Sequence, residues 1–161
     1  MEFEVIQELI NSLKEILQEE KTIQIPNTGE KDKIELKSSS YMFTVDLNRR
    51  GIRKPKCSFQ LREQQHKEYP LLRLDLIGRT HTNPPGEHPF SKEDIPCPHI
   101  HIAHPDYGDS IAYPLNSTYA KIFLTKDELE DLAKVLETFL KRCHVGNIDE
   151  YTIEYQNSLF W

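Results

Sequence analysis

Residues 56–78 read KCSFQLREQQHKEYPLLRLDLIG, and this stretch predicts two antiparallel strands joined by a short connection. Apolar side chains recur at every second position in both halves, at Cys57, Phe59, Leu61, Leu72, Leu74 and Leu76. Successive side chains of a strand point to opposite faces of a sheet, so one face of this hairpin is apolar and the other is polar. The polar residues 64–70 suit the connection. The stretch therefore predicts a sheet with one face packed on a core.

Patterns on either side of this hairpin complete the fold prediction. An apolar stripe predicts a helix over residues 3–19, and a capping box from Thr125 to Glu128 opens a second helix that Gly146 ends. Further strands are expected at residues 22–26, 33–37, 41–49, 99–103 and 110–115. We expect one α+β domain over residues 1–161. It has a single mainly antiparallel sheet of about five to seven strands, with an N-terminal and a C-terminal helix packed on one face.

The last residues, 147–161, form an unusually aromatic tail. Tyr151, Ile153 and Tyr155 alternate with polar residues, which favours a last strand, and the chain ends in Leu-Phe-Trp. Such a tail either folds back on the domain or docks on a protein partner.

Composition narrows the class of protein. The mean hydropathy is −0.62, and no apolar run approaches the roughly 18 residues of a membrane span, so we expect no membrane partner. Three widely spaced cysteines with no CxxC pair favour reduced thiols and a cytoplasmic location. The net charge of −6 argues against a protein that simply coats nucleic acid.

Positive charge is nevertheless concentrated in residues 48–62, which contain no acid. A local group of cations on an acidic protein is typical of a phosphate-facing edge, although a solvated hairpin turn has the same composition. The candidate phosphate- or RNA-binding residues are Arg49, Arg50, Arg53, Lys54, Lys56 and Arg62.

Residues 79–104, RTHTNPPGEHPFSKEDIPCPHIHIAH, contain five of the seven histidines and five prolines. Imidazole is the side chain best suited to proton transfer and metal binding near neutral pH, and proline stiffens the loop that holds it. If residues 99–103 form a strand, Ile100 and Ile102 point into the core while His99 and His101 share the other face. We take His81, His99 and His101 as the candidate catalytic residues. The alternative is a half-exposed strand with two solvated histidines.

Our leading hypothesis from these residues is an RNA-directed, metal-independent endoribonuclease with no cofactor. Two histidines would supply the base and the acid, and the basic residues would stabilise the charged phosphorane. Asn83 is expected to orient the His81 loop, and Tyr107 and Tyr113 to stack on bases. The partner would be RNA or a ribonucleoprotein.

Two alternatives remain open. His81, His99 and His101 together would suit a transition-metal ion such as zinc, with one position left for water. A small acidic protein with an aromatic tail would also suit a non-enzymatic inhibitor that binds another protein, as an anti-defence or anti-CRISPR-like factor does.

The chain resembles a small uncharacterised family of bacteria and phages. The resemblance lies in residues 56–62 (KCSFQLR), 81–84 (HTNP), 98–101 (PHIH), 107–108 (YG) and 112–115 (AYPL). It implies a role in mobile elements or host–phage conflict, without an established activity. The order of a helix followed by an antiparallel sheet is also similar to compact endoribonuclease toxins, on architecture alone.

Overall fold

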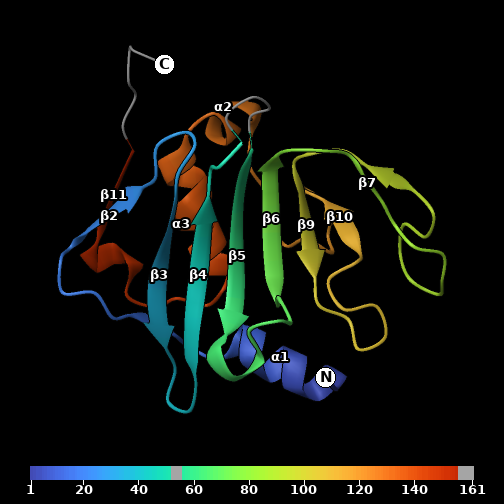
Figure 1. Cartoon of the computed structure of the whole chain (residues 1–161), viewed down its shortest axis with the longest axis horizontal. Coiled ribbons are helices and arrows are strands. Elements are labelled where there is room, and N and C mark those ends of the chain that lie inside the picture. Colours follow the sequence, from blue (N-terminus) through green and yellow to red (C-terminus); the bar gives the residue numbers. More distant parts are fainter. Residues whose placement is uncertain (52–55, 156–161) are drawn as a thin grey trace.

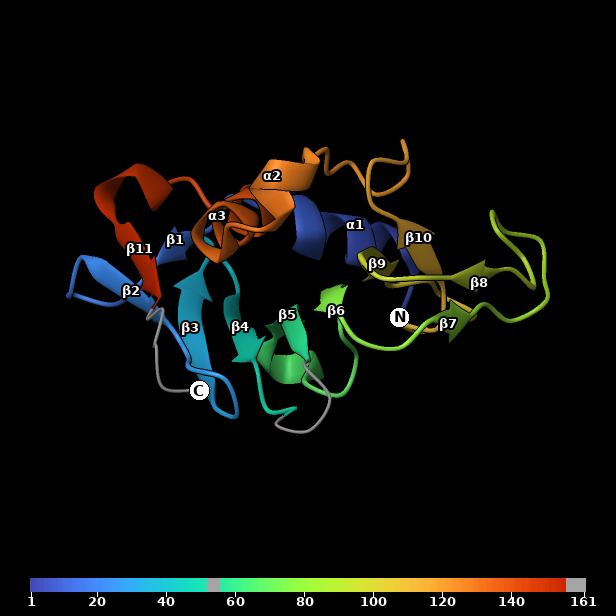
Figure 2. The ribbon, with the colours of Figure 1, turned by 90° about the horizontal axis from the view of Figure 1, so that it is seen from above.

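The computed structural model describes residues 1–51 and 56–155 of the 161-residue chain. Two layers make up the molecule, with the helices packed together on one face of a large sheet (Figures 1 and 2). This confirms the predicted α+β class and the placement of the N-terminal and C-terminal helices on one face. None of the helices described is long and apolar enough to cross a membrane.

Seven strands form the main sheet, in the order β1-β3-β4-β5-β6-β9-β10, and all neighbouring strands are antiparallel. Their bounds are β1 (Glu15–Ile16), β3 (Lys31–Lys37), β4 (Met42–Asn48), β5 (Cys57–Glu63), β6 (Leu72–Ile77), β9 (His99–Ile102) and β10 (Ala112–Pro114). The central hairpin β5–β6 forms as predicted, with a 3₁₀ turn at η1 (Gln64–His66) in its connection. The sheet thus has the number of strands that the alternating patterns predict.

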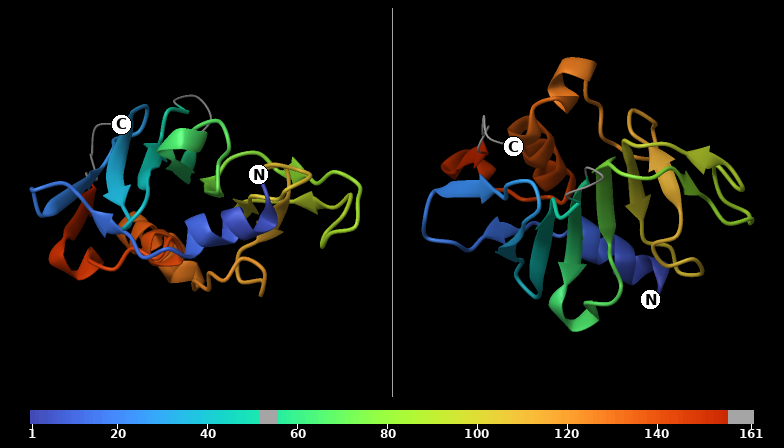
Figure 3. Two further views of the ribbon diagram at one scale, coloured as in Figure 1. Left: turned by 90° about the horizontal axis from the view of Figure 1, so that it is seen from below. Right: turned by 45° about the horizontal axis from the view of Figure 1, so that its top comes forward.

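Two small sheets lie beside the main one (Figure 3). β2 (Thr22–Ile25) pairs in parallel with β11 (Thr152–Tyr155), so the aromatic tail folds back on the domain as far as Tyr155. β7 (His81–Thr82) and β8 (Asp94–Ile95) pair within the stretch expected to be a loop. Residues 156–161 lie outside the described structure, and docking of their aromatic side chains on a partner stays a prediction.

The first helix is shorter than predicted. α1 (Phe3–Asn11) ends where the backbone of Ser12 becomes extended, and the chain continues as β1, in which Ile16 is buried. Leu13 and Leu17, which the helix was expected to bury, are exposed on either side of this edge strand, so the predicted helix over residues 3–19 was wrong in its second half.

The C-terminal helical segment is divided in two. The predicted capping box is present and opens α2 (Lys126–Leu129), but Asp131 then caps a separate helix, α3 (Leu132–Arg142). The predicted stop at Gly146 was also wrong. The left-handed residue is His144, at φ 61°, and the amide of Val145 donates to the carbonyl of Leu140 to close the end of α3. A last 3₁₀ turn, η2 (Ile148–Glu150), leads into β11.

The core lies between the helices and the apolar face of the sheet. Ile6 and Leu9 of α1, and Leu136 and Phe139 of α3, are fully buried with the inward-facing side chains of the strands. The Phe59 and Phe139 rings meet here at 6.1 Å. The opposite face carries the polar side chains of the same strands, and the candidate site is built there.

Replacing Ile100 with alanine is expected to lower the free energy of unfolding by about 2–5 kcal/mol, because the side chain is fully buried in the core and its loss leaves a cavity. Urea denaturation measures the change. Ile77→Ala is the matched control, since Ile77 is 46 % exposed and the expected change is about 0.5 kcal/mol. Equal costs at the two positions would contradict the assigned strand faces.

Candidate metal centre

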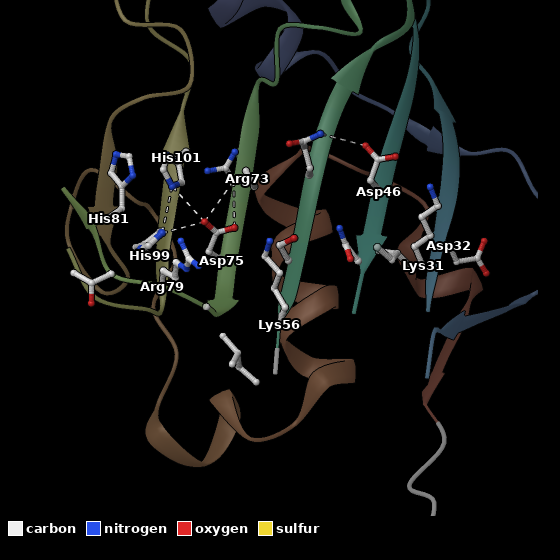
Figure 4. Close-up of a pocket in the computed structure, with 17 residues that line it drawn as sticks. Lys31, Asp32, Asp46, Lys56, Arg73, Asp75, Arg79, His81, His99 and His101 are labelled. Carbon is white, nitrogen blue, oxygen red and sulfur yellow. Dashed lines mark hydrogen bonds and ion pairs between the residues drawn. The ribbon is translucent and has the colours of Figure 1, made fainter. Parts of the chain in front are cut away.

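Three side chains from two neighbouring strands converge on the polar face of the sheet. Strand β6 pairs with β9 so that Asp75 lies opposite His99, and His101 lies two pairs further along, opposite Arg73. His99 Nε2 is 3.0 Å and His101 Nε2 is 3.3 Å from the same oxygen, Asp75 Oδ2, and the two Nε2 atoms are 3.2 Å apart. Figure 4 shows the three side chains pointing toward one another. Antiparallel pairing thus brings together residues 24 positions apart in sequence.

The outer nitrogens of both rings fix their tautomers. His99 Nδ1 lies 3.1 Å from the carbonyl oxygen of Ile95, and His101 Nδ1 lies 2.8 Å from that of Asp109. A carbonyl oxygen only accepts, so each Nδ1 must donate its hydrogen. In the neutral rings both Nε2 atoms therefore carry lone pairs, and these point at each other and at a carboxylate oxygen.

Three lone-pair atoms in such a triangle repel one another unless a metal ion or a proton lies between them. Zn–N and Zn–O bonds of about 2.1 Å place two ligand atoms about 3.4 Å apart in a tetrahedral site, and about 3.0 Å apart at right angles in an octahedral one. The observed separations of 3.0, 3.2 and 3.3 Å lie in this range. A ring N–H donated to a backbone carbonyl is also what a metal-binding histidine normally has. The donor set of two imidazoles and one carboxylate suits Zn²⁺ or Fe²⁺.

Both histidines are buried, with 0 % and 1 % of their surface exposed, which differs from the alternative of a half-exposed strand with two solvated histidines. Burial by itself lowers the pKa of a histidine, and it lowers that of His101. At His99 the hydrogen bonds to Asp75 and Cys97 outweigh burial and raise the pKa to about 9. Burial would raise the pKa of Asp75, but hydrogen bonds from the two histidines and the charge of Arg73 hold it well below its usual range. Without a metal, a proton on His99 balances the negative charge of the Asp75 carboxylate.

Arg73 supports the carboxylate from the same strand. Its Nε donates to Asp75 Oδ1 at 3.2 Å, and its Nη1 donates to Asp109 Oδ2 at 3.0 Å. The backbone carbonyl of Asp109 accepts from His101, so one loop residue restrains both the arginine and a candidate ligand. These second contacts hold Asp75 and His101 in fixed orientations.

His81 lies beside the triangle and is not one of its members. Its ring is edge-on to that of His101, with centroids 4.7 Å apart, and its Nε2 donates to the carbonyl of Ser110 at 2.6 Å. The donor atoms that lie within 4.8 Å of one another belong to Asp75, His99 and His101. The structure therefore favours Asp75 over His81 as the third ligand.

Asn83, which was expected to orient the His81 loop, bonds the backbone of that loop and of the neighbouring strand β10. It is 2 % exposed, its Oδ1 accepts from the amide of Ala112 at 2.8 Å, and its Nδ2 donates to the carbonyls of Ala112 and Phe90. These bonds satisfy the backbone of Ala112 on the free edge of β10. They hold the β7–β8 arm, residues 81–95, against that edge.

An elongated groove extends from the triangle across the polar face of the sheet. Its volume is about 930 Å³, and side chains of β3, β4, β5, β6 and β9 line it (Figure 4). Among its lining residues are four cations, Lys31, Lys56, Arg73 and Arg79. Arg79 was not singled out from sequence, although it is the first residue of the histidine-rich stretch 79–104.

The predicted phosphate-binding residues are dispersed, and only Lys56 of those described lines the groove. Arg62 faces the same side but donates two hydrogen bonds to Asp46, at 2.6 and 2.9 Å. Arg49 donates to Pro26 and Thr28, and Arg50 is exposed next to it. Arg53 and Lys54 lie outside the described residues.

The two tyrosines expected to stack on bases are outside the groove as well. Tyr107 packs against the rings of His88 and His104. Tyr113 pairs in register with Ile100, which places its side chain on the helix-covered face, where it stacks on Tyr119. Neither is placed to contact a ligand beside His99 and His101.

A family model matches residues 1–145, which is most of the chain. The chain belongs to DUF6978, a family of unknown function. Comparison with curated proteins and with solved structures gives no match. Asp75, His99 and His101 all fall within the matched residues, whereas the aromatic tail lies beyond them. An uncharacterised family was expected from the sequence; the similarity to endoribonuclease toxins has no support from these comparisons.

Proposed function

We propose that this protein is a metal-dependent hydrolase whose ion is held by Asp75, His99 and His101. The observation that carries the proposal is the triangle of three lone-pair atoms, with both Nδ1–H groups donated to backbone carbonyls. Three protein ligands leave at least one position for water or substrate, as in catalytic zinc sites.

The same geometry fits the metal-free endoribonuclease hypothesis less well. A base and an acid in phosphoryl transfer act on the attacking and the leaving oxygen, which lie roughly in line on opposite sides of phosphorus. His99 and His101 instead direct their Nε2 atoms, 3.2 Å apart, at a single carboxylate oxygen. Their Nδ1 atoms are occupied by backbone carbonyls. Neither ring therefore has a free nitrogen with which to exchange a proton with one side of a substrate.

Hydrolysis suits the surroundings of the triangle. A divalent ion held there would lower the pKa of a coordinated water to about 7 and polarise a bound ester. In ester hydrolysis the water oxygen forms a bond to the electrophilic atom, the bond to the leaving oxygen breaks, and that oxygen receives a proton. Water is a reactant, so an open polar groove favours this reaction. Oxygen activation, the other chemistry of this donor set, needs its reactive intermediates kept from water.

Titration of the metal-free protein with Zn²⁺ or Co²⁺ in a calorimeter is expected to show one ion bound per chain. His81→Ala is expected to keep that stoichiometry, because His81 Nε2 is occupied by the Ser110 carbonyl and its ring lies outside the donor triangle. Loss of the bound ion in His81→Ala would favour the three-histidine alternative. Hydrolysis of a generic phosphodiester should then depend on the added ion and stop with EDTA. A fully active EDTA-treated protein would overturn the proposal.

A further inference from the structure

We infer that the groove binds a single strand of nucleic acid through its phosphates, which places scissile phosphodiester groups at the metal centre. The inference rests on the proposed function and names its substrate class.

The extent of the groove favours a chain molecule over a small phosphate ester. Its lining side chains come from β9, β6, β5, β4 and β3, which are consecutive neighbours in the sheet. Strands in a sheet lie about 4.8 Å apart, so these four steps span about 19 Å. This length exceeds one phosphate group several times over, and a nucleic-acid strand repeats its phosphates along such a path.

Positive charge recurs along this path. Arg79 lies near the triangle, Lys56 near the middle and Lys31 on the far strand (Figure 4). No ion pair joins any of these three to another residue within the described segments, whereas Arg73 is occupied by Asp75 and Asp109. The chain has a net charge of −6, so three such cations beside a metal ion set this groove apart. They suit it to bind a polyanion.

The acidic residues of the groove do not cancel this charge at the metal end. Asp75 is a proposed ligand, and Asp46 is neutralised by the two hydrogen bonds from Arg62. Asp32 lies on the far strand β3, beside Lys31. The end next to the triangle is therefore the more positive one.

The lining also predicts the manner of recognition. Among residues 1–51 and 56–155, no phenylalanine, tyrosine or tryptophan lines the groove, so base stacking from this part of the chain contributes little. Binding is then dominated by phosphate contacts, with strong salt dependence and weak sequence preference.

Fluorescence anisotropy of a labelled 12-nucleotide RNA strand, with EDTA present, tests the inference apart from the metal. A plot of log affinity against log salt is expected to have a slope of about −2, for three phosphates at about −0.7 each on single strands. The double variant Lys56→Gln/Arg79→Gln should weaken binding by about tenfold or more at moderate salt and reduce the slope by about 1.4. Both side chains are exposed, so the variant should fold normally, which circular dichroism checks.

Lys141→Gln is the matched control, because Lys141 is exposed on α3, on the opposite face of the sheet, and should bind as the unmodified protein does. A DNA strand of the same sequence, the corresponding duplex, and competition by inorganic phosphate complete the experiment. Comparable binding of RNA and DNA strands, above that of the duplex, supports the inference. Tighter binding of the duplex, full displacement by millimolar phosphate, or an unaffected double variant would overturn it.

Failure of the two proposals can be told apart. If strands bind with the predicted salt slope but no ion is bound, the groove assignment stands and the hydrolase does not. If an ion is bound and supports ester hydrolysis but no strand binds, the substrate class is wrong and the metal centre stands.

Discussion

Replacing Asp75 with asparagine is expected to lower metal affinity by more than about 100-fold and to abolish metal-dependent hydrolysis. Removing even an outer contact of a metal site costs about 10- to 100-fold in affinity, and Asp75 is the only anionic ligand of the proposed three. Asparagine has nearly the same shape, and Arg73 keeps its contact with Asp109, so the fold should be retained. Calorimetric titration with Zn²⁺ measures the loss.

Asp46→Asn is the control for this variant. Asp46 lies on the same face of the sheet and also pairs with an arginine, but it is not part of the triangle. Its metal affinity should equal that of the unmodified protein. If both variants lose the ion equally, or if Asp75→Asn keeps it, Asp75 is not a ligand. Asp75→Asn is a better probe than His101→Ala, because the fully buried His101 also contributes packing and its removal would confound stability with activity.

Replacing Lys14 with methionine is expected to lower the free energy of unfolding by about 2–6 kcal/mol. Lys14 is fully buried, and its ammonium donates to the carbonyls of Ile10, Ser12 and Cys143 at 2.8–2.9 Å. It therefore joins the C-terminal ends of α1 and α3. Ile10 keeps a second donor in His144, so the buried carbonyl of Cys143 and the partly buried carbonyl of Ser12 lose their partner, at about 1–3 kcal/mol each.

Thermal and urea unfolding measure this cost. Lys37→Met provides the comparison, since Lys37 is exposed on β3 and its replacement should change stability by about 0.5 kcal/mol or less. Burial lowers the pKa of Lys14 to about 8, so the ammonium is still charged at pH 7, where the experiment is done. A cost at Lys14 no larger than at Lys37 would show that the two helix ends do not depend on this side chain.

Local pattern predicted most of the sheet. Alternation at Phe43, Val45 and Leu47, and in the β5–β6 hairpin, placed each apolar side chain on the correct face, because a strand has only two faces and one is buried. The helix limits failed where tertiary contacts override propensity. After Asn11 the chain becomes extended and enters an edge strand that buries Ile16, and Asp131 divides the second helix.

The candidate site could be predicted only in part. His99 and His101 were found because both lie on one strand at a spacing of two. Asp75 was missed because its place opposite His99 depends on the pairing of β6 with β9, across a stretch that contains its own small sheet. Its one signal was an acid next to an arginine on the polar face of its strand, in RLDLI. The phosphate-binding role was predicted for too many of the basic residues of 48–62, since composition does not show that Arg62 is already paired with Asp46.

The burial of the two histidines could not be predicted for a similar reason. The period of two gives the face of a strand but not what covers that face. Here the neighbouring carboxylate of Asp75, the β7–β8 arm anchored by Asn83 and the ring of His81 lie against them. The endoribonuclease and the protein-binding inhibitor both stay predictions, as does their place in bacterial or phage conflict.

The most direct test of the metal centre is a crystal structure of protein soaked with Zn²⁺ or Co²⁺, with anomalous scattering recorded at the absorption edge of the metal. The predicted result is one strong anomalous peak about 2.0–2.2 Å from Asp75 Oδ2, His99 Nε2 and His101 Nε2, with His81 still bonded to the carbonyl of Ser110. A peak bound instead by His81, or no peak at this triangle at saturating metal, would contradict the account.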